Sequence, residues 1–265
     1  MPRPDPAEPQ RFLYSTRIGF GRQVRGEGES VGARDGPGGE RTSALRFWSE
    51  DPASLIREGS GYWKYVPTAD GVRFLTDYNY RTRFGALGRI FDSLIFRPLL
   101  GWGTAWSFDR LRLWLEKGVD PETSLQMGLL HSLARVSLAF VWLYHGLVPK
   151  ILFEDPDEIR MLVRSGIPPG SVATALLAVG VGEVVLGLAF LFPRLGRAPF
   201  FVSLAFLVVA TILAVTTFTD YLTAAFNPLT LNVLGISMSI AGLIAGRRAP
   251  SARACLRKPP RGAGS

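Results

Sequence analysis

The chain has 265 residues, with 30 Lys and Arg against 22 Asp and Glu, and its formal net charge is +8. Its one cysteine, Cys255, excludes an internal disulfide bond and a cysteine-ligated metal cluster. The positive charge comes with no zinc-finger spacing and no RNA-binding signature, so nucleic acid is not an expected partner.

Charge and hydropathy divide the chain into three parts. Residues 1–128 mix charged and apolar residues, residues 129–246 are mostly apolar, and residues 247–265 are polar and basic. Such a division is typical of a folded domain, a membrane domain and a tail. Residues 1–11 are rich in proline and predicted to be disordered, and they lack the apolar core of a signal peptide. We therefore expect the first domain to stay on the side of the membrane where it is made.

Strands and turns are predicted for residues 12–82. In the clearest strand, every second residue is apolar, aromatic or Thr, as expected of a half-buried strand. That strand is Val72–Arg81, and its inward residues are Val72, Phe74, Thr76, Tyr78 and Tyr80. Less regular strands are predicted at Leu13–Phe20, Val24–Val31, Thr42–Trp48 and Ser54–Tyr65. Turn signals lie at Asp35–Gly39, Gly59–Gly61 and Asp70-Gly71, so the short connections predict an antiparallel meander.

Residues 86–117 change to a helical pattern. One stripe of this segment consists of Leu87, Ile90, Phe91, Leu94 and Ile95. Pro98 and the Gly101–Gly103 segment are expected to interrupt the helix. Because an antiparallel sheet needs its apolar face covered, this helix is the predicted cover. Asp120-Pro121-Glu122 is the predicted boundary with the membrane domain.

Four apolar stretches follow, each of about 20 residues, which is the length needed to cross a bilayer core. They lie at about 130–151, 172–192, 199–219 and 228–246. The fourth stretch has small and polar residues on one stripe, which favours close helix packing in lipid. These residues are Asn232, Gly235, Ser239, Gly242 and Gly246.

Basic residues give the predicted orientation. They are concentrated after the fourth span and in the turn at residues 193–198, whereas the loop after the third span has Asp220 and no Lys or Arg. By the positive-inside rule, we expect a multi-pass protein of the cell membrane with both termini in the cytoplasm.

Five polar residues of the membrane domain are candidates for a functional site, because ionisable groups in a bilayer are costly. They are Arg135, His145, Lys150, Glu183 and Asn227. Arg135 and Glu183 are close enough in depth to predict a buried ion pair, which either serves function or only locks two helices. Pro149 is expected to kink or end the first span and to leave His145 and Lys150 near the interface, level with Asp220, Tyr221 and Asn227.

Catalysis is not indicated by the first domain. It contains no histidine, its Gly19-x-Gly21 and Gly26-x-Gly28 pairs do not open a helix, and no residue is selected as a catalytic group. We expect no catalytic residues, no metal site and no bound cofactor, and whether the chain is an enzyme stays open.

Two segments carry a resemblance to a known family of membrane proteins. RVSLAFVWLYHGLVPKILFEDPDE at 135–158 and FNPLTLNVLG at 226–235 resemble the DoxX-like family of four-helix bacterial membrane proteins over residues 129–246. The resemblance implies the four-helix fold and draws attention to His145, Pro149, Lys150, Glu158, Glu183 and Asn227. That wider family includes a subunit associated with thiosulfate:quinone oxidation.

The N-terminal part carries a second resemblance. Residues 12–117, with the closing run YRTRFGALGRIFDSLIFRPLLGWGTAWSFDRLRLWLE, are similar to the later part of an SRPBCC (START-like) domain. That resemblance implies a helix-grip fold, in which an antiparallel sheet wraps a long helix around an apolar cavity that binds lipids and similar molecules. Such domains open with a strand and two short helices, whereas here the chain opens with the proline-rich residues 2–9. Either the start is misassigned or the domain is incomplete.

Together these observations predict an α+β, SRPBCC-like domain over residues 12–118, followed by an all-α bundle of four transmembrane helices. The expected function is a cytoplasmic module that binds a lipid or another apolar small molecule and is tethered to the bilayer. The expected cavity residues are Trp63, Phe74, Thr76, Tyr78 and Tyr80, unless these aromatic residues are plain core. The alternatives are a subunit of a quinone-linked oxidoreductase, with a redox partner subunit or an oligomer, and a small-solute carrier.

Overall fold

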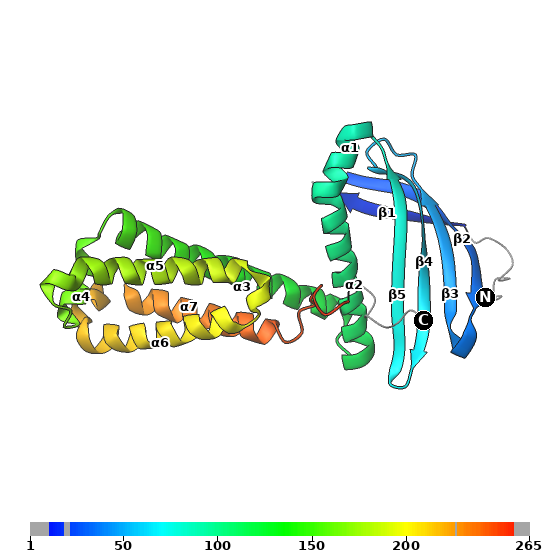
Figure 1. The fold of residues 1–265 in the computed structure, drawn as a ribbon. Coiled ribbons are helices and arrows are strands. Elements are labelled where there is room, and N and C mark those ends of the chain that lie inside the picture. Colours follow the sequence, from blue (N-terminus) through cyan, green and yellow to red (C-terminus); the bar gives the residue numbers. More distant parts are fainter. Residues whose placement is uncertain (1–10, 19–21, 226, 257–265) are drawn as a thin grey trace. The chain divides into compact units, whose positions relative to one another are not determined.

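The structure, a computed structural model, describes residues 11–18, 22–225 and 227–256. The chain divides into two units, residues 1–101 and 102–265 (Figure 1). Nearly all of the segment predicted to be disordered, 1–11, lies outside the described residues, and so do Phe20 and the last part of the basic tail, 257–265.

The first unit contains an antiparallel sheet of five strands in the order β1-β2-β3-β4-β5. The strands are β1 (Arg11–Ile18), β2 (Arg22–Asp35), β3 (Arg41–Trp48), β4 (Ile56–Thr68) and β5 (Gly71–Thr82). Each strand pairs with its neighbour in sequence, so the predicted meander is confirmed. The predicted turns at Asp35–Gly39 and Asp70-Gly71 also form, and Gly38 and Gly39 there adopt positive φ angles of 68° and 79°.

The predicted turn at Gly59–Gly61 is wrong, because both glycines lie inside β4. Gly59 is opposite Tyr80 and Gly61 is opposite Tyr78 on β5. A methyl group on Gly59 would collide with the ring of Phe47. One on Gly61 would lie 2.6 Å from the backbone oxygen of Asp77. These glycines therefore make room for neighbouring groups within the sheet, which is a recognised role of glycine in strands.

A continuous helical segment follows the sheet. It consists of α1 (Gly85–Phe91), the π-helical turn η2 (Asp92–Phe96) and α2 (Arg97–Lys117), so the expected interruption at Gly101–Gly103 is wrong. Pro98 follows directly after the π-helical turn. Because a proline ring clashes with the carbonyl four residues earlier, the extra residue in such a turn relieves the clash. α2 begins in the first unit and ends in the second.

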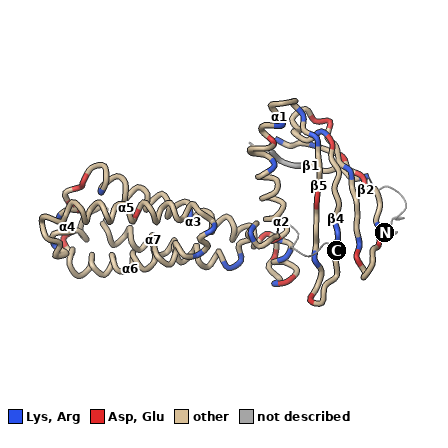
Figure 2. Tube along the Cα trace, in the orientation of Figure 1, with Lys and Arg blue, Asp and Glu red and all other residues tan. Residues whose placement is uncertain are grey.

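Four helical segments of the second unit are long and apolar enough to cross a membrane, as predicted, within the described residues. They are α3 (Pro121–Gly146) with the π-helical turn η3 (Leu147–Leu152), α5 (Val172–Leu191), α6 (Ala198–Thr217) and α7 (Pro228–Ala245). A short helix, α4 (Pro156–Arg164), follows η3. The charged residues of this unit gather mainly toward the two ends of the bundle, and α6 and α7 carry none (Figure 2).

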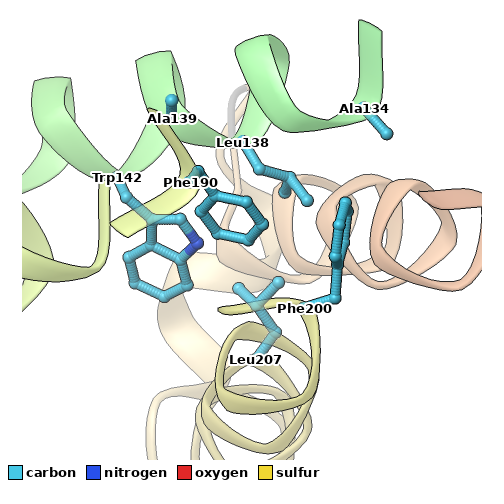
Figure 3. Packing of buried hydrophobic residues seen from close by; sticks show 7 residues of the cluster. All are labelled: Ala134, Leu138, Ala139, Trp142, Phe190, Phe200 and Leu207. Atoms are coloured by element: carbon cyan, nitrogen blue, oxygen red, sulfur yellow. The ribbon is translucent and has the colours of Figure 1, made fainter. Parts of the chain in front are cut away.

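Aromatic and aliphatic side chains from α3, α5 and α6 form the core of the bundle (Figure 3). These residues are Ala134, Leu138, Ala139, Trp142, Phe190, Phe200 and Leu207. The small residues of α7 pack against α6, as predicted: a methyl group on Gly242 would collide with Phe200, and one on Gly235 would lie 2.7 Å from Leu207. The hydroxyls of Ser239 and Ser203 lie 3.3 Å apart within this contact.

The described part of the C-terminal segment is bound to α2 within the second unit. The backbone N–H of Ser251 donates a 2.7 Å hydrogen bond to the buried carboxylate of Asp109. The thiol of Cys255 lies 3.1 Å from the backbone oxygen of Ala105. At least residues 251–255 of the predicted tail therefore have a fixed place beside α2.

Candidate functional site

Arg135 closes one end of the bundle. Its buried guanidinium group donates to the carbonyl oxygens of Phe190 and Gly196 at 2.8 Å, of Phe192 at 3.0 Å and of Ala189 at 3.4 Å. Because α5 ends at Leu191, these carbonyls belong to its last turn and to the loop that follows, where a helix leaves such groups without intrahelical partners. Arg135 therefore caps α5 from the side of α3.

The predicted ion pair between Arg135 and Glu183 is wrong. The donors of Arg135 are directed to backbone carbonyls, whereas Glu183 pairs with Lys150. Similar depth in the membrane was therefore a poor guide to pairing, since the two side chains leave their helices toward different ends of α5. Arg135 binds backbone carbonyl oxygens in place of the Glu183 carboxylate, and the position of such oxygens cannot be inferred from residue types.

Lys150, Glu158 and Glu183 form a cluster that we call the ionic cluster. The ammonium group of Lys150 donates a 2.9 Å hydrogen bond to Glu158 Oε1 and lies 3.0 Å from Glu183 Oε2. It also donates to the backbone oxygen of His145 at 3.4 Å. The side chains of Lys150 and Glu183 are each 7% exposed, and that of Glu158 is 27% exposed.

One oxygen of this cluster lacks a hydrogen bond. No donor among the described residues meets Glu183 Oε2 at hydrogen-bonding geometry, even though Lys150 Nζ is 3.0 Å away. The contact between Lys150 and Glu183 Oε2 is therefore an ion pair that lacks good hydrogen-bond geometry. A buried acceptor without a donor is uncommon in a folded protein and calls for an explanation.

The π-helical turn η3 brings Lys150 into the bundle. Pro149 was expected to leave Lys150 at the interface, but the segment continues as a helix through Leu152 and Lys150 is buried. The extra residue of a π turn rotates the following side chains around the helix axis, and such turns are frequent at functional sites. Gly146 and Gly180 permit the close approach: a methyl group on Gly180 would lie 2.9 Å from the Cβ of Lys150.

A methyl group at Gly180 tests this packing. We expect Gly180→Ala to destabilise the bundle by about 1–3 kcal/mol, because the added carbon overpacks the contact of α5 with η3. Gly182→Ala is the matched control on the same helix, since a methyl group there meets nothing within 4 Å. That control should change stability by less than about 1 kcal/mol, in the stabilising direction. Unfolding titrations with sodium dodecyl sulfate would measure both, and equal stability of the two variants would contradict the close packing.

The other polar residues near α4 are divided among separate contacts. Arg164 binds both carboxylate oxygens of Asp220 at 2.8 Å, and Tyr221 donates to Asp157 at 3.4 Å. The Arg164 guanidinium lowers the pKa of the exposed Asp220, so this ion pair is present at neutral pH and is lost as the pH falls. Asn227 caps α7 by accepting from the backbone N–H of Thr230 at 3.0 Å.

The expected polar group of His145, Lys150, Asp220, Tyr221 and Asn227 is thus not one site. Lys150 joins Glu183, Asp220 joins Arg164, and Asn227 is a helix cap. His145 contributes its backbone oxygen to Lys150. Within the described residues, no group of three or more His, Cys, Asp or Glu is arranged to hold a metal ion.

The expected cavity residues of the first unit share one face of the sheet. Trp63 pairs with Thr76 across β4 and β5, and Tyr65 pairs with Phe74, so these side chains point to the same side. The rings of Tyr65 and Phe74 are 5.1 Å apart, and those of Trp63 and Phe74 are 6.4 Å apart. Trp63 remains 44% exposed and Tyr65 38% exposed. This aromatic face is therefore incompletely covered within the structure.

Tyr80 attaches the helical segment to this face. Its hydroxyl donates a 2.6 Å hydrogen bond to the buried carboxylate of Asp92 in η2, which also binds Arg97 at 3.0 Å. Burial and this hydrogen bond raise the pKa of Tyr80 from 10.0 to about 12, so the phenol keeps its proton at neutral pH. Asp92 was not predicted from the sequence, although an acidic residue beside an apolar helical stripe is a signal for a buried polar contact.

A cleft of the first unit lies elsewhere. It has a volume of about 640 Å³ and is lined by residues at the ends of β3, β4 and β5 and the start of α1. These residues include Trp48, Ser49, Arg57, Thr82, Arg83 and Phe84. None of the five expected cavity residues lines this cleft. On the aromatic face, by contrast, Trp63 and Tyr65 are exposed at the surface.

Two comparisons relate the chain to known membrane proteins. The chain is 49% identical over 142 residues to YndG, an uncharacterized membrane protein of Bacillus subtilis (strain 168). That match covers 53% of this chain and 53% of the relative, so the chain spans about half the length of the curated relative that it matches. No solved structure matches the chain. Residues 139–240 match the model of the DoxX-like family, which confirms that resemblance for the membrane part of the chain.

Proposed function

We propose that the chain is a DoxX-like membrane protein whose N-terminal unit binds an apolar small molecule on the aromatic face of its sheet. One observation carries this proposal: Trp63 and Tyr65 are exposed beside Phe74 on a face where apolar side chains normally pack. Exposed aromatic patches of this kind mark binding sites for ligands or partners. The helix-grip arrangement expected from the SRPBCC resemblance belongs to the same proposal.

The membrane supplies the reason for an apolar ligand. A bundle of four spanning helices keeps the N-terminal unit beside the bilayer, where lipids and their derivatives are concentrated. The positive-inside rule supports a cytoplasmic location for this unit, since the turn at residues 193–197 and the segment after α7 carry the excess of arginine. We therefore expect the ligand to come from the cytoplasmic leaflet.

Replacing Trp63 tests the proposal on the full chain in lipid nanodiscs. A photoactivatable long-chain fatty acid would be bound and cross-linked, and mass spectrometry would locate the labelled residues. We expect labels on the aromatic face and about tenfold weaker labelling in Trp63→Ser, because loss of a large aromatic contact costs about 1.5 kcal/mol of binding free energy.

The matched control is Tyr62→Ser. Tyr62 is the neighbouring residue on β4, it is 40% exposed, and its side chain points to the opposite face of the sheet. Labelling should be unchanged in this variant. Equal labelling of the wild-type chain, Trp63→Ser and Tyr62→Ser would refute binding on the aromatic face.

The two alternatives have less support. A quinone-linked redox subunit would have to rely on Glu183 and His145 without Arg135, whose donors are engaged by four backbone carbonyls. A small-solute carrier needs a polar path across the bundle, and α6 and α7 contribute no charged residue to one. Both alternatives therefore stay predictions.

A further inference from the structure

With all its groups ionised, the ionic cluster has a net charge of −1, because it has two carboxylates and one ammonium group. Two carboxylates, Glu158 and Glu183, face the single ammonium group of Lys150. Lys150 and Glu183 both belong to membrane-spanning segments. An unbalanced charge is costly there, because the surrounding medium solvates ions poorly.

Other charged groups of the bundle do not supply the missing positive charge. Arg135 is engaged at the last turn of α5, and α6 and α7 carry no ionisable residue. His145, on α3, meets the cluster through its backbone oxygen, and its imidazole interacts electrostatically with Lys150 and Glu158; the imidazole is positively charged only after it takes up a proton from outside the chain. From α4, the residue that reaches the cluster is Glu158, which is itself an acid. A balancing charge therefore has to come from outside the chain.

The packing around the cluster restricts the size of a balancing ligand. Gly180 is so close to η3 that a methyl group would lie 2.9 Å from the Cβ of Lys150 and 3.0 Å from the backbone oxygen of Gly146. A proton adds no volume, so it is a positive charge that this packing accommodates without rearrangement. The oxygen that lacks a donor, Glu183 Oε2, is itself buried.

We propose that Glu183 is a proton-binding site inside the membrane, loaded from the end of the bundle where α4 lies. The carboxylate of Glu183 takes up one proton and becomes a neutral carboxylic acid, while Lys150 and Glu158 remain an ion pair, so the net charge of the cluster changes from −1 to zero. Glu158, 27% exposed, connects the surface to Lys150, and Lys150 connects Glu158 to Glu183. This site is independent of the proposed binding of an apolar molecule.

Infrared spectroscopy of the full chain in lipid nanodiscs tests the proposal. A protonated carboxyl group has a carbonyl band separate from that of a carboxylate. We expect one such band at neutral pH in the wild-type chain, its loss in Glu183→Gln, and its survival at a shifted frequency in Glu183→Asp. In Lys150→Met the band should persist to higher pH, because no ammonium group then favours the carboxylate.

Glu158→Gln distinguishes the two acids. With Glu158 neutral, Lys150 balances Glu183, so the band should appear only at lower pH but keep the high frequency of a buried acid. The absence of a protonated-acid band from the wild-type chain at every pH where its helices remain folded would overturn the proposal. A band that survives unchanged in Glu183→Gln would also overturn it. So would a band that is absent from Glu158→Gln at every pH, because the proton would then belong to Glu158. Circular dichroism establishes for each variant that the helices are folded.

Discussion

Arg135→Leu is expected to destabilise the bundle by about 3 kcal/mol, because the carbonyl oxygens of Phe190 and Gly196 lose their donor, while those of Ala189 and Phe192 keep a backbone donor. The guanidinium of Arg135 satisfies the oxygens of Ala189, Phe190, Phe192 and Gly196. In a membrane protein, water is less able to replace a lost donor, so each unpaired carbonyl is costly. The fraction of folded protein, followed by circular dichroism during titration with sodium dodecyl sulfate, measures the loss.

Two variants make this result specific. Arg135→Lys keeps the positive charge but replaces the planar fork of donors with a single ammonium group, and we expect an intermediate loss. Arg194→Leu changes an exposed arginine in the turn that Arg135 holds, and it should shift stability by no more than about 0.5 kcal/mol. If Arg135→Leu is as stable as Arg194→Leu, the capping role assigned to Arg135 is incorrect.

Lys150→Met is the second substitution with a large expected effect. At a pH high enough to ionise Glu183, it leaves the carboxylates of Glu158 and Glu183 without a counter-ion, and breaking a buried ion pair in this way costs about 3–5 kcal/mol. The loss should become smaller as the pH falls, because protonation removes the charges that repel each other. Unfolding titrations at a series of pH values measure both the size and the pH dependence of this loss.

The double variant Lys150→Met/Glu183→Gln separates charge from packing. Because it removes both members of the most buried pair, it should regain most of the stability that Lys150→Met loses at the high pH where Glu183 is ionised. Lys117→Met, at the exposed end of α2, controls for the loss of a lysine as such and should have little effect. A double variant that is as unstable as Lys150→Met would show that repulsion between the acids is not the cause.

Much of the architecture was predictable from local patterns. Alternation of side chains from Val72 to Arg81 predicted β5, and the length of the apolar stretches predicted the spanning helices α5, α6 and α7 closely. Such patterns succeed because burial on one face of a strand, or on all sides of a helix, determines residue type directly. Exact ends were less predictable, since α3 begins at Pro121 and therefore earlier than its apolar part.

The details of the candidate site were less predictable, for physical reasons. Pro149 was expected to kink or end the first span, but a π-helical turn at Leu147–Leu152 continues the helix, and such a turn cannot be recognised from the usual helical period. Arg135 found backbone acceptors in place of Glu183, and backbone carbonyls are present whatever the sequence. Gly59 and Gly61 resembled a turn signal because glycine serves both turns and crowded strands.

The way Arg135 binds its acceptors has a consequence for the divergence of related chains. All four of its hydrogen bonds go to main-chain oxygens of residues 189–196, and none depends on the side chains of those residues. Substitutions in that turn can therefore accumulate as long as the backbone path is kept. A substitution at position 135, in contrast, removes the donors themselves. We therefore expect the arginine on α3 to be retained in related chains whose sequences differ in the turn that it binds.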